Sequence, residues 1–84
     1  MDTRWTVYII EADDGSLYTG VTTDVERRFA EHRDGPRGAR YFRGRRPRAV
    51  VYTESGHDRS SAARREAAIK RLGRDAKLAL IRGA

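Results

Sequence analysis

The chain has 84 residues, of which 38% are hydrophobic and 36% are charged, and it contains no cysteine. This length allows one small domain, residues 1–84, and the lack of thiols excludes a disulfide framework and a cysteine nucleophile. Eighteen lysines and arginines stand against twelve acids, a net charge of +6 that favours a polyanionic partner, nucleic acid rather than a membrane. We expect a cytoplasmic protein, because there is neither an export signal nor an apolar run long enough to span a membrane.

The first third of the chain predicts a β-hairpin. Residues 5–11 are mostly β-branched and aromatic, residues 17–22 form the returning strand, and an Asp-Gly pair lies between them. A two-residue loop would put Tyr8 and Tyr18 on opposite faces of the hairpin. A three-residue loop with a left-handed glycine pairs Tyr8 with Gly20 and places both tyrosines on one face. We favour the three-residue loop, and we note that a glycine inside a strand marks a bulge or a close approach.

A first helix follows the hairpin. Thr23 and Glu26 have the spacing of a capping box, and the helix is expected to stop at Gly35-Pro36. The side chains that this helix directs inward are Val25, Phe29 and His32. Arg28 flanks them. A lone inward histidine is more often bonded to a backbone carbonyl than catalytic, so both interpretations of His32 stay open.

The segment of residues 33–48 holds seven arginines and one acid, together with three glycines and two prolines. This composition predicts an irregular segment. Tyr41 and Phe42 lie in the middle of it. A run of basic residues is usually a solvated surface, whereas basic residues interleaved with aromatic ones are a better indication of nucleic-acid binding.

The second half of the chain predicts one strand and two helices. Residues 48–54 form the third strand, and residues 55–56 turn the chain. Asp58 or Ser60 caps the next helix, and Asp75 opens a short last helix. The element order is therefore β-β-α-β-α-α, and we expect an α+β fold with a three-stranded antiparallel sheet flanked by helices.

A carboxylate interrupts the apolar stripe of the second helix, which is expected to run to Leu72 and to end at Gly73. The stripe comprises Ala62, Ile69 and Leu72. Glu66 falls on its edge, where burial of a carboxylate costs free energy unless a cation meets it. The pattern alone favours a salt bridge from Glu66 to Lys70 or to an arginine over a functional role.

Taken in order, these residues resemble the GIY-YIG nuclease superfamily, in particular its small stand-alone bacterial members. The matching residues are Tyr8, then Tyr18-Thr19-Gly20, then Arg28 and His32, then Glu66 with Lys70 behind it. The resemblance covers nearly the whole chain. The first triplet of the family is Thr6-Val7-Tyr8 here, so only its tyrosine is present, and the chain has no asparagine for the supporting role found in many larger members.

The resemblance implies a metal-dependent endonuclease that hydrolyses phosphodiester bonds in DNA, in repair or recombination. Glu66 would bind Mg²⁺ or Mn²⁺, and Tyr8 would take the proton of the attacking water, with its pKa lowered by Arg28 and the metal. Arg28 would hold the scissile phosphate. Tyr18 and His32 would orient the water, the phosphate or the leaving group.

Further substrate contacts are expected from residues around this set. They are Gly20 at the floor of the site, Lys70, Arg40, Arg43, Arg45 and Arg46. The resemblance favours DNA over RNA, and the sequence does not indicate an oligomeric state. The alternatives are a nucleic-acid-binding module without turnover and an interaction domain whose charges only solvate it. A binding module has no need of an acid that repels phosphate, so Glu66 favours the nuclease.

Overall fold

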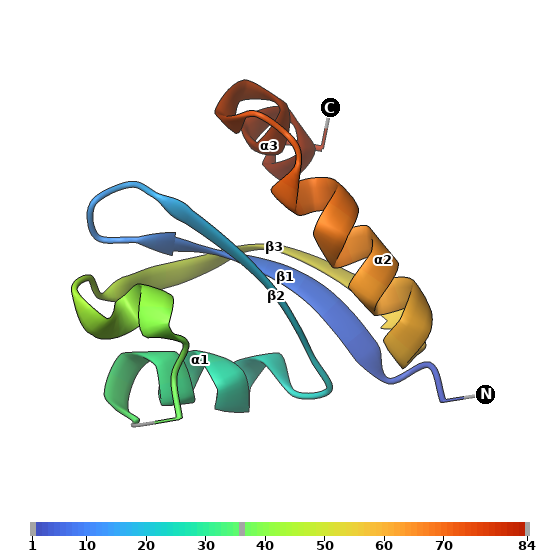
Figure 1. The fold of residues 1–84 in the computed structure, drawn as a ribbon, viewed down its shortest axis with the longest axis horizontal. Coiled ribbons are helices and arrows are strands. Elements are labelled where there is room, and N and C mark those ends of the chain that lie inside the picture. The colour runs from blue at the N-terminus through green and yellow to red at the C-terminus, as the bar shows by residue number, and fades with distance from the viewer. Residues whose placement is uncertain (1, 36, 84) are drawn as a thin grey trace.

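The computed structural model describes residues 2–35 and 37–83, and Figure 1 shows its strands and helices. The elements are β1 (Trp5–Ala12), β2 (Leu17–Thr22), α1 (Val25–Asp34), the 3-10 helix η1 (Arg40–Arg43), β3 (Pro47–His57), α2 (Arg59–Lys70) and α3 (Arg74–Ile81). The predicted α+β class and the order β-β-α-β-α-α are confirmed. The basic segment is less irregular than predicted, because burial of Phe42 holds its centre in η1.

The sheet has the order β2-β1-β3 with antiparallel pairing throughout, so β1 is its central strand. Tyr8 pairs with Gly20, as the three-residue hairpin loop predicts. The loop turns at Gly15, whose φ of +83° lies in the left-handed region that glycine adopts without strain. Tyr8 and Tyr18 therefore project from the same face of the sheet.

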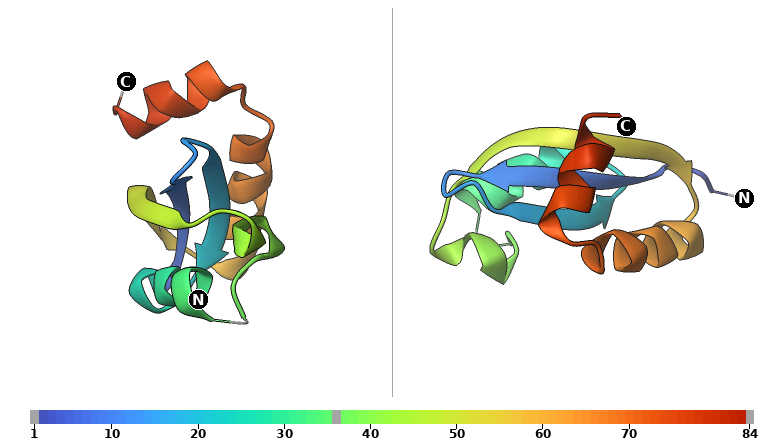
Figure 2. Two further views of the ribbon diagram at one scale, coloured as in Figure 1. Left: turned by 90° about the vertical axis from the view of Figure 1, so that its left-hand side faces the viewer. Right: turned by 90° about the horizontal axis from the view of Figure 1, so that it is seen from above.

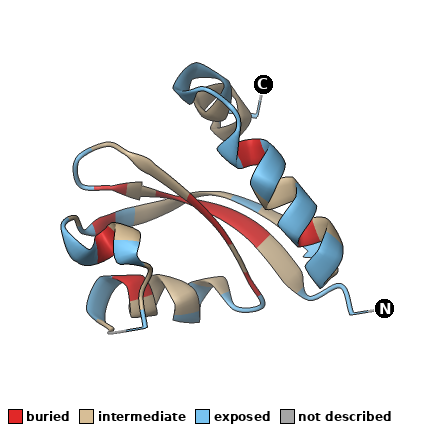
Figure 3. Ribbon diagram, viewed as in Figure 1, coloured by how far each residue is buried: buried red, intermediate tan, exposed pale blue. Residues whose placement is uncertain are grey.

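Helices cover both faces of the sheet, as Figures 1 and 2 show. On the face covered by α2 and α3, the buried cluster consists of Val7, Ile9, Ala62 and Ile69. On the face covered by α1 and η1, it consists of Tyr8, Ile10, Ala12 and Phe42. The central strand thus contributes to both clusters, which is why its sequence is apolar without alternation. Figure 3 shows this concentration of buried residues along β1.

Both longer helices begin at an aspartate. The N-cap of α1 is Asp24, whose side chain accepts the Arg27 N–H at 3.0 Å. The prediction of Thr23 as the cap is wrong by one residue, because adjacent Thr and Asp residues are both good caps and the pattern does not separate them. Asp58 caps α2 by accepting the Ser61 N–H at 2.7 Å, which is one of the two predicted alternatives.

The turn predicted after the third strand is absent. β3 runs through residues 55–56 to His57, because Gly56 adopts a φ of +82° within the strand and does not reverse the chain. At the end of α1, Gly35 is the C-cap, as predicted. Pro36, the other half of that predicted stop, lies outside the described residues.

The connection between α2 and α3 also differs from prediction. α2 ends at Lys70, and α3 begins at Arg74 after the N-cap Gly73, with Asp75 in its first turn. Leu72 lies in this connection and is 36% exposed. Its predicted place on the buried stripe is therefore wrong, because the helix ends before it. Within the described ranges, no helix has the length and apolar character that a membrane crossing requires.

Candidate active site

Tyr8 lies in the middle of β1 and is 1% exposed. Its ring extends across the neighbouring strand above Gly20, where an added Cβ atom would lie 2.5 Å from the Tyr8 hydroxyl oxygen. A methyl group at this position would collide with the phenol. The absence of a side chain at Gly20 therefore allows the Tyr8 ring to cross over β2. The structure thus places Gly20, expected as the floor of the substrate site, directly beneath Tyr8.

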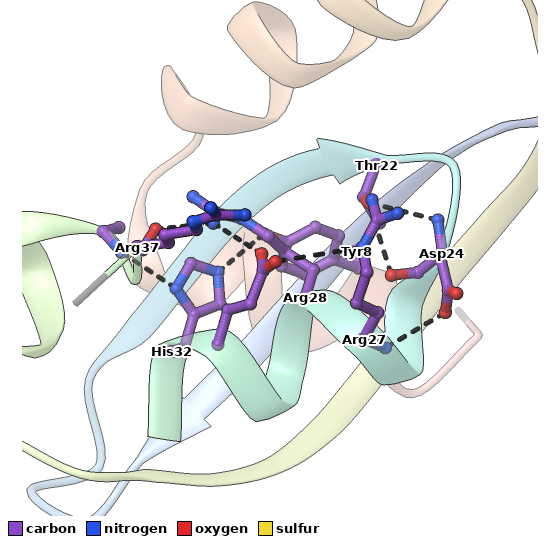
Figure 4. Close-up of polar contacts among 9 residues, drawn as sticks. Tyr8, Thr22, Asp24, Arg27, Arg28, His32 and Arg37 are labelled. Atoms are coloured by element: carbon purple, nitrogen blue, oxygen red, sulfur yellow. Dashed lines mark hydrogen bonds and ion pairs between the residues drawn. The ribbon is translucent and has the colours of Figure 1, made fainter. Parts of the chain in front are cut away.

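A chain of hydrogen bonds connects Tyr8 to the segment before η1 (Figure 4). The Tyr8 hydroxyl lies 2.9 Å from His32 Nε2, and the Ala39 N–H donates to His32 Nδ1 at 3.0 Å. Because Nδ1 accepts a hydrogen bond, the neutral imidazole carries its proton on Nε2 and donates it to the Tyr8 oxygen. Tyr8 is therefore the acceptor in this bond, which is the orientation that a base requires.

His32 is neutral at physiological pH. Burial, and then the nearby charge of Arg28, lower the pKa of His32 to about 4. The imidazole ring packs against Tyr18 and Phe42, with centroid distances of 5.3 and 4.8 Å. Both ring nitrogens of His32 form hydrogen bonds, so the polar atoms of this buried side chain have partners. One of these bonds also directs a donor at Tyr8.

The protein's own groups keep Tyr8 protonated. Burial first, and then the neighbouring Tyr18, raise the pKa of Tyr8, with a smaller contribution from Glu66. Arg28 lowers the pKa of the same group but is outweighed. The positive charge of Arg28 is therefore insufficient by itself to make Tyr8 a base at neutral pH.

Arg28 extends from α1 beside Tyr8, as Figure 4 shows. Its Nη1 donates to Glu31 Oε1 at 2.9 Å and to the Arg37 carbonyl at 2.7 Å. The side chain is 28% exposed. Both bonds use Nη1, and the guanidinium also lies close enough to act on the Tyr8 phenol, so an anion bound by Arg28 would lie beside Tyr8.

Tyr18 reaches the same face from β2. Its ring centroid lies 6.3 Å from that of Tyr8 and 5.2 Å from that of Tyr41. It therefore forms an aromatic link between the buried phenol and the surface near η1. The fold brings five of the predicted site residues together here: Tyr8, Tyr18, Gly20, Arg28 and His32.

Glu66 approaches from α2, which packs on β2 and β1 from the other face. Its Oε2 lies 3.4 Å from the Lys70 Nζ, and the two side chains are 25% and 52% exposed. The salt bridge that the sequence pattern favours is thus present, and at this exposure it contributes little stability. The charge of Glu66 nevertheless raises the pKa of Tyr8, so the carboxylate lies within electrostatic reach of the phenol.

Glu66 offers one carboxylate to a cation. In the ranges 2–35 and 37–83, no three histidine, cysteine, aspartate or glutamate side chains come together to hold a metal. Mg²⁺ keeps several of its waters and needs only one or two protein carboxylates, so the partly exposed carboxylate of Glu66 fits a hard, largely hydrated cation.

The arginines predicted to bind substrate lie in or directly after η1. They are Arg40, Arg43, Arg45 and Arg46. Arg45 stacks over the Tyr41 ring at 4.2 Å and pairs with Asp14 of the hairpin at 3.2 Å. Phe42 is 9% exposed and belongs to the buried cluster. Of the two aromatic residues in the basic segment, Tyr41 is the one that reaches the surface.

The backbone part of the site could not be predicted from the sequence. Gly38 lies directly against α1, where an added Cβ atom would be 2.7 Å from the Glu31 carbonyl oxygen and 2.8 Å from His32 Cα. This close approach brings the Ala39 N–H to His32. In the sequence Gly38 is one of three glycines in a segment predicted to be irregular. Only its distance from His32 along the chain could have distinguished it from the other two.

A phenol above a strand glycine, with an arginine and a histidine on the following helix, is the arrangement expected from the resemblance to GIY-YIG nucleases. Residues 4–79 match the family described as the GIY-YIG catalytic domain, and the chain belongs to this family. It is a nuclease family that acts on nucleic acids.

The relatives are small proteins, and this chain covers between 71% and 95% of each of the following three. The chain is 50% identical over 78 residues to a UPF0213 protein of Desulfotalea psychrophila, a match that covers 93% of this chain and 71% of that protein. It is 55% identical over 74 residues to a UPF0213 protein of Halobacterium salinarum, with 88% and 95% covered. The solution NMR structure of a UPF0213 protein from Bacillus halodurans is 44% identical, with a TM-score of 0.58 and coverage of 92% and 81%.

Proposed function

We propose that this chain is a metal-dependent endonuclease that hydrolyses phosphodiester bonds in DNA, in the cytoplasm, during repair or recombination. The observation that supports it most directly is the direction of the hydrogen bond between His32 and Tyr8. His32 donates, so the Tyr8 oxygen is placed as an acceptor beside Arg28, a side chain suited to phosphate. The choice of DNA over RNA rests on the family resemblance.

Tyr8 is the general base in this proposal. Its phenolate would be stabilised by the His32 Nε2–H and by the charge of Arg28, and it would take a proton from the attacking water. Because the pKa of Tyr8 is raised by its surroundings, this role needs a further positive charge. A divalent cation, Mg²⁺ or Mn²⁺, held by Glu66 would supply it and would stabilise the charge that develops on the phosphate.

Arg28 is the phosphate-binding group. Its guanidinium now bonds two oxygens, those of Glu31 and of the Arg37 carbonyl, and a phosphate would present two oxygens to the same fork. Tyr18 would help to orient the phosphate or the water. Lys70 would contribute a weaker substrate contact, because a phosphate would compete with Glu66 for its ammonium group.

A nucleic-acid-binding module without turnover is the second candidate. Two observations favour it: Glu66 is paired with Lys70, and Tyr8 is protonated in its own environment. This alternative keeps the basic surface and Arg28 as binding groups but gives Tyr8 and Glu66 structural roles only.

Substitution of Glu66 separates the two candidates. In the nuclease, Glu66→Ala abolishes cleavage of branched and linear DNA in Mg²⁺ or Mn²⁺, while binding stays intact or tightens because a negative charge facing phosphate is removed. Mn²⁺ raises the melting temperature of the wild type and does not raise that of Glu66→Ala. Lys70→Ala, which breaks the same salt bridge, keeps the Mn²⁺ shift and most of the cleavage, because it removes only the weaker substrate contact. Full nuclease activity in Glu66→Ala would overturn the proposed metal role, and binding without cleavage by the wild type would favour the second candidate.

A further inference from the structure

Two cavities adjoin each other beyond the end of α1, with volumes of about 330 and 300 Å³. Their common wall consists of His32, Arg33, Phe42 and Arg43. The first cavity continues along residues 33–35 and 38–39, and the second along residues 43–47 to Asp13 of the hairpin. We call this continuous depression the α1–η1 groove.

The groove is cationic. Four arginines line it: Arg33, Arg43, Arg45 and Arg46. It contains two acids, and both are already engaged, since Asp34 pairs with Arg33 at 2.8 Å and Asp13 accepts the Arg46 main-chain N–H at 3.2 Å. Within the part of the chain that the structure describes, the Arg43 and Arg46 side chains take part in no ion pair. The groove therefore has positive charge available to an anion.

The groove meets the candidate active site at His32. The imidazole forms part of both cavity walls, and its Nε2 lies 2.9 Å from the Tyr8 hydroxyl. One ring thus separates the reactive phenol from the groove. A nucleic-acid strand whose scissile phosphate lies at Arg28 and Tyr8 would have an adjacent sugar–phosphate unit at the mouth of the groove.

We propose that the α1–η1 groove is a second phosphate site, which holds the nucleic-acid backbone next to the scissile phosphate through Arg33 and Arg43. This inference rests on the proposed function. It differs from the sequence-based set in its residues, because Arg33 lines the groove and Arg40 does not. Arg48 also contributes nothing to it, since its guanidinium bonds Glu11 and the Asp13 carbonyl.

The test compares a long oligonucleotide with bis(p-nitrophenyl) phosphate, a small diester that occupies the scissile position alone. The groove variant is Arg33→Gln/Arg43→Gln, and the matched control, with the same loss of charge, is Arg64→Gln/Arg82→Gln. Arg64 and Arg82 are exposed residues outside the groove. All four side chains are at the surface, and thermal melts verify that both variants fold; the single variant Arg43→Gln replaces the double variant if the latter does not.

We expect the groove variant to lose about tenfold in kcat/KM on the oligonucleotide, and the slope of log K against log salt to decrease by about 2, one for each phosphate contact. Its hydrolysis of bis(p-nitrophenyl) phosphate should equal that of the wild type, and the control should match the wild type on both substrates. Equal losses of kcat/KM on the oligonucleotide in the groove variant and in the control would overturn the proposed second phosphate site. A parallel loss on the small diester would also overturn it, because Arg33 and Arg43 would then act at the scissile phosphate. Absence of hydrolysis by the wild type would instead contradict the proposed function, and the salt slope would still test the groove.

Discussion

His32 donates its Nε2–H to the Tyr8 oxygen across 2.9 Å, and the main chain of Ala39 fixes this direction by occupying Nδ1. The bond links the central strand to the first helix, and the helix in turn to the segment that precedes η1. The His32 imidazole therefore has two roles. It packs against Tyr18 and Phe42, and it keeps the Tyr8 oxygen as a hydrogen-bond acceptor. Its protonation would disturb both, since a proton on Nδ1 would displace the Ala39 N–H.

The buried imidazole makes stability depend on pH. The pKa of His32 is about 4 in the folded chain, against an ordinary value of 6.5. Between these two values the unfolded state binds more protons than the folded state, so the free energy of unfolding falls as the pH drops through this window. The total loss is on the order of 3 kcal/mol, and the contribution is fully present above pH 6.5.

Urea unfolding of the wild type and of His32→Gln at a series of pH values measures this effect. We expect the wild type to lose more stability than the variant between neutral pH and pH 4, because the glutamine does not titrate. His57 and all the carboxylates are present in both proteins and cancel in the comparison. Parallel stability curves for the two proteins would contradict the assignment of a lowered pKa to His32.

Gly20 controls the position of the Tyr8 hydroxyl. Gly20→Ala would place a methyl group 2.5 Å from that oxygen, so we expect a loss of about 1–3 kcal/mol in the free energy of unfolding and a weakened bond to His32. Gly44→Ala is the control, because an added Cβ atom at Gly44 meets no atom within 4 Å. Denaturant unfolding of both variants measures the difference, and equal stabilities would show that Tyr8 does not lie over Gly20.

The hairpin is the part of the fold that could be predicted best from sequence. Its register depends on local features, namely an Asp-Gly pair and strand residues that alternate between the two faces. Once the three-residue loop is chosen, the pairing of Tyr8 with Gly20 follows. The limits of the helices were less predictable, because neighbouring residues such as Thr23 and Asp24 have nearly equal capping propensity. Which of them caps α1 depends on the path of the chain out of β2.

The side-chain part of the site could be predicted, and the backbone part could not. Tyr8, Arg28 and His32 carry distinctive chemistry at distinctive spacings. Gly38 and the Ala39 N–H contribute through a close approach of main chain to α1, which is a tertiary contact without a local signal. The direction of the Tyr8 pKa shift could not be predicted for the same reason. Burial of Tyr8, which raises its pKa, outweighs the charge of Arg28 only once the fold is formed.

The close approach at Gly38 gives a prediction about the tautomer of His32. Gly38→Ala would bring a methyl group within 2.7 Å of the Glu31 carbonyl oxygen, and backbone atoms cannot rotate away as a side chain can. We expect the segment to move off α1 and the bond from Ala39 to Nδ1 to be lost. ¹⁵N NMR of the imidazole would then show both neutral tautomers, against Nε2–H alone in the wild type. A single tautomer in the variant would contradict the proposed role of Gly38.

Glu54 joins the end of the sheet to the helix that carries Glu66. Its carboxylate accepts the Tyr52 hydroxyl at 2.6 Å and the Arg65 Nε–H at 3.0 Å, and lies 2.7 Å from His57 Nε2. Burial acts to raise the pKa of Glu54, but these hydrogen bonds outweigh it and hold the pKa below its ordinary value. The charged form of Glu54 is therefore the form that stabilises the fold.

Glu54→Gln keeps the shape of the side chain and removes its charge. We expect it to cost about 1–2 kcal/mol at neutral pH, because three donors lose a charged acceptor in a partly exposed site. A group with a lowered pKa contributes stability above its ordinary pKa of 4.5 and loses it as the pH falls through the folded value. The difference between wild type and Glu54→Gln should therefore shrink below pH 4.5. Equal stability of Glu54→Gln and the wild type in urea unfolding at neutral pH would exclude Glu54 as the brace between β3 and α2.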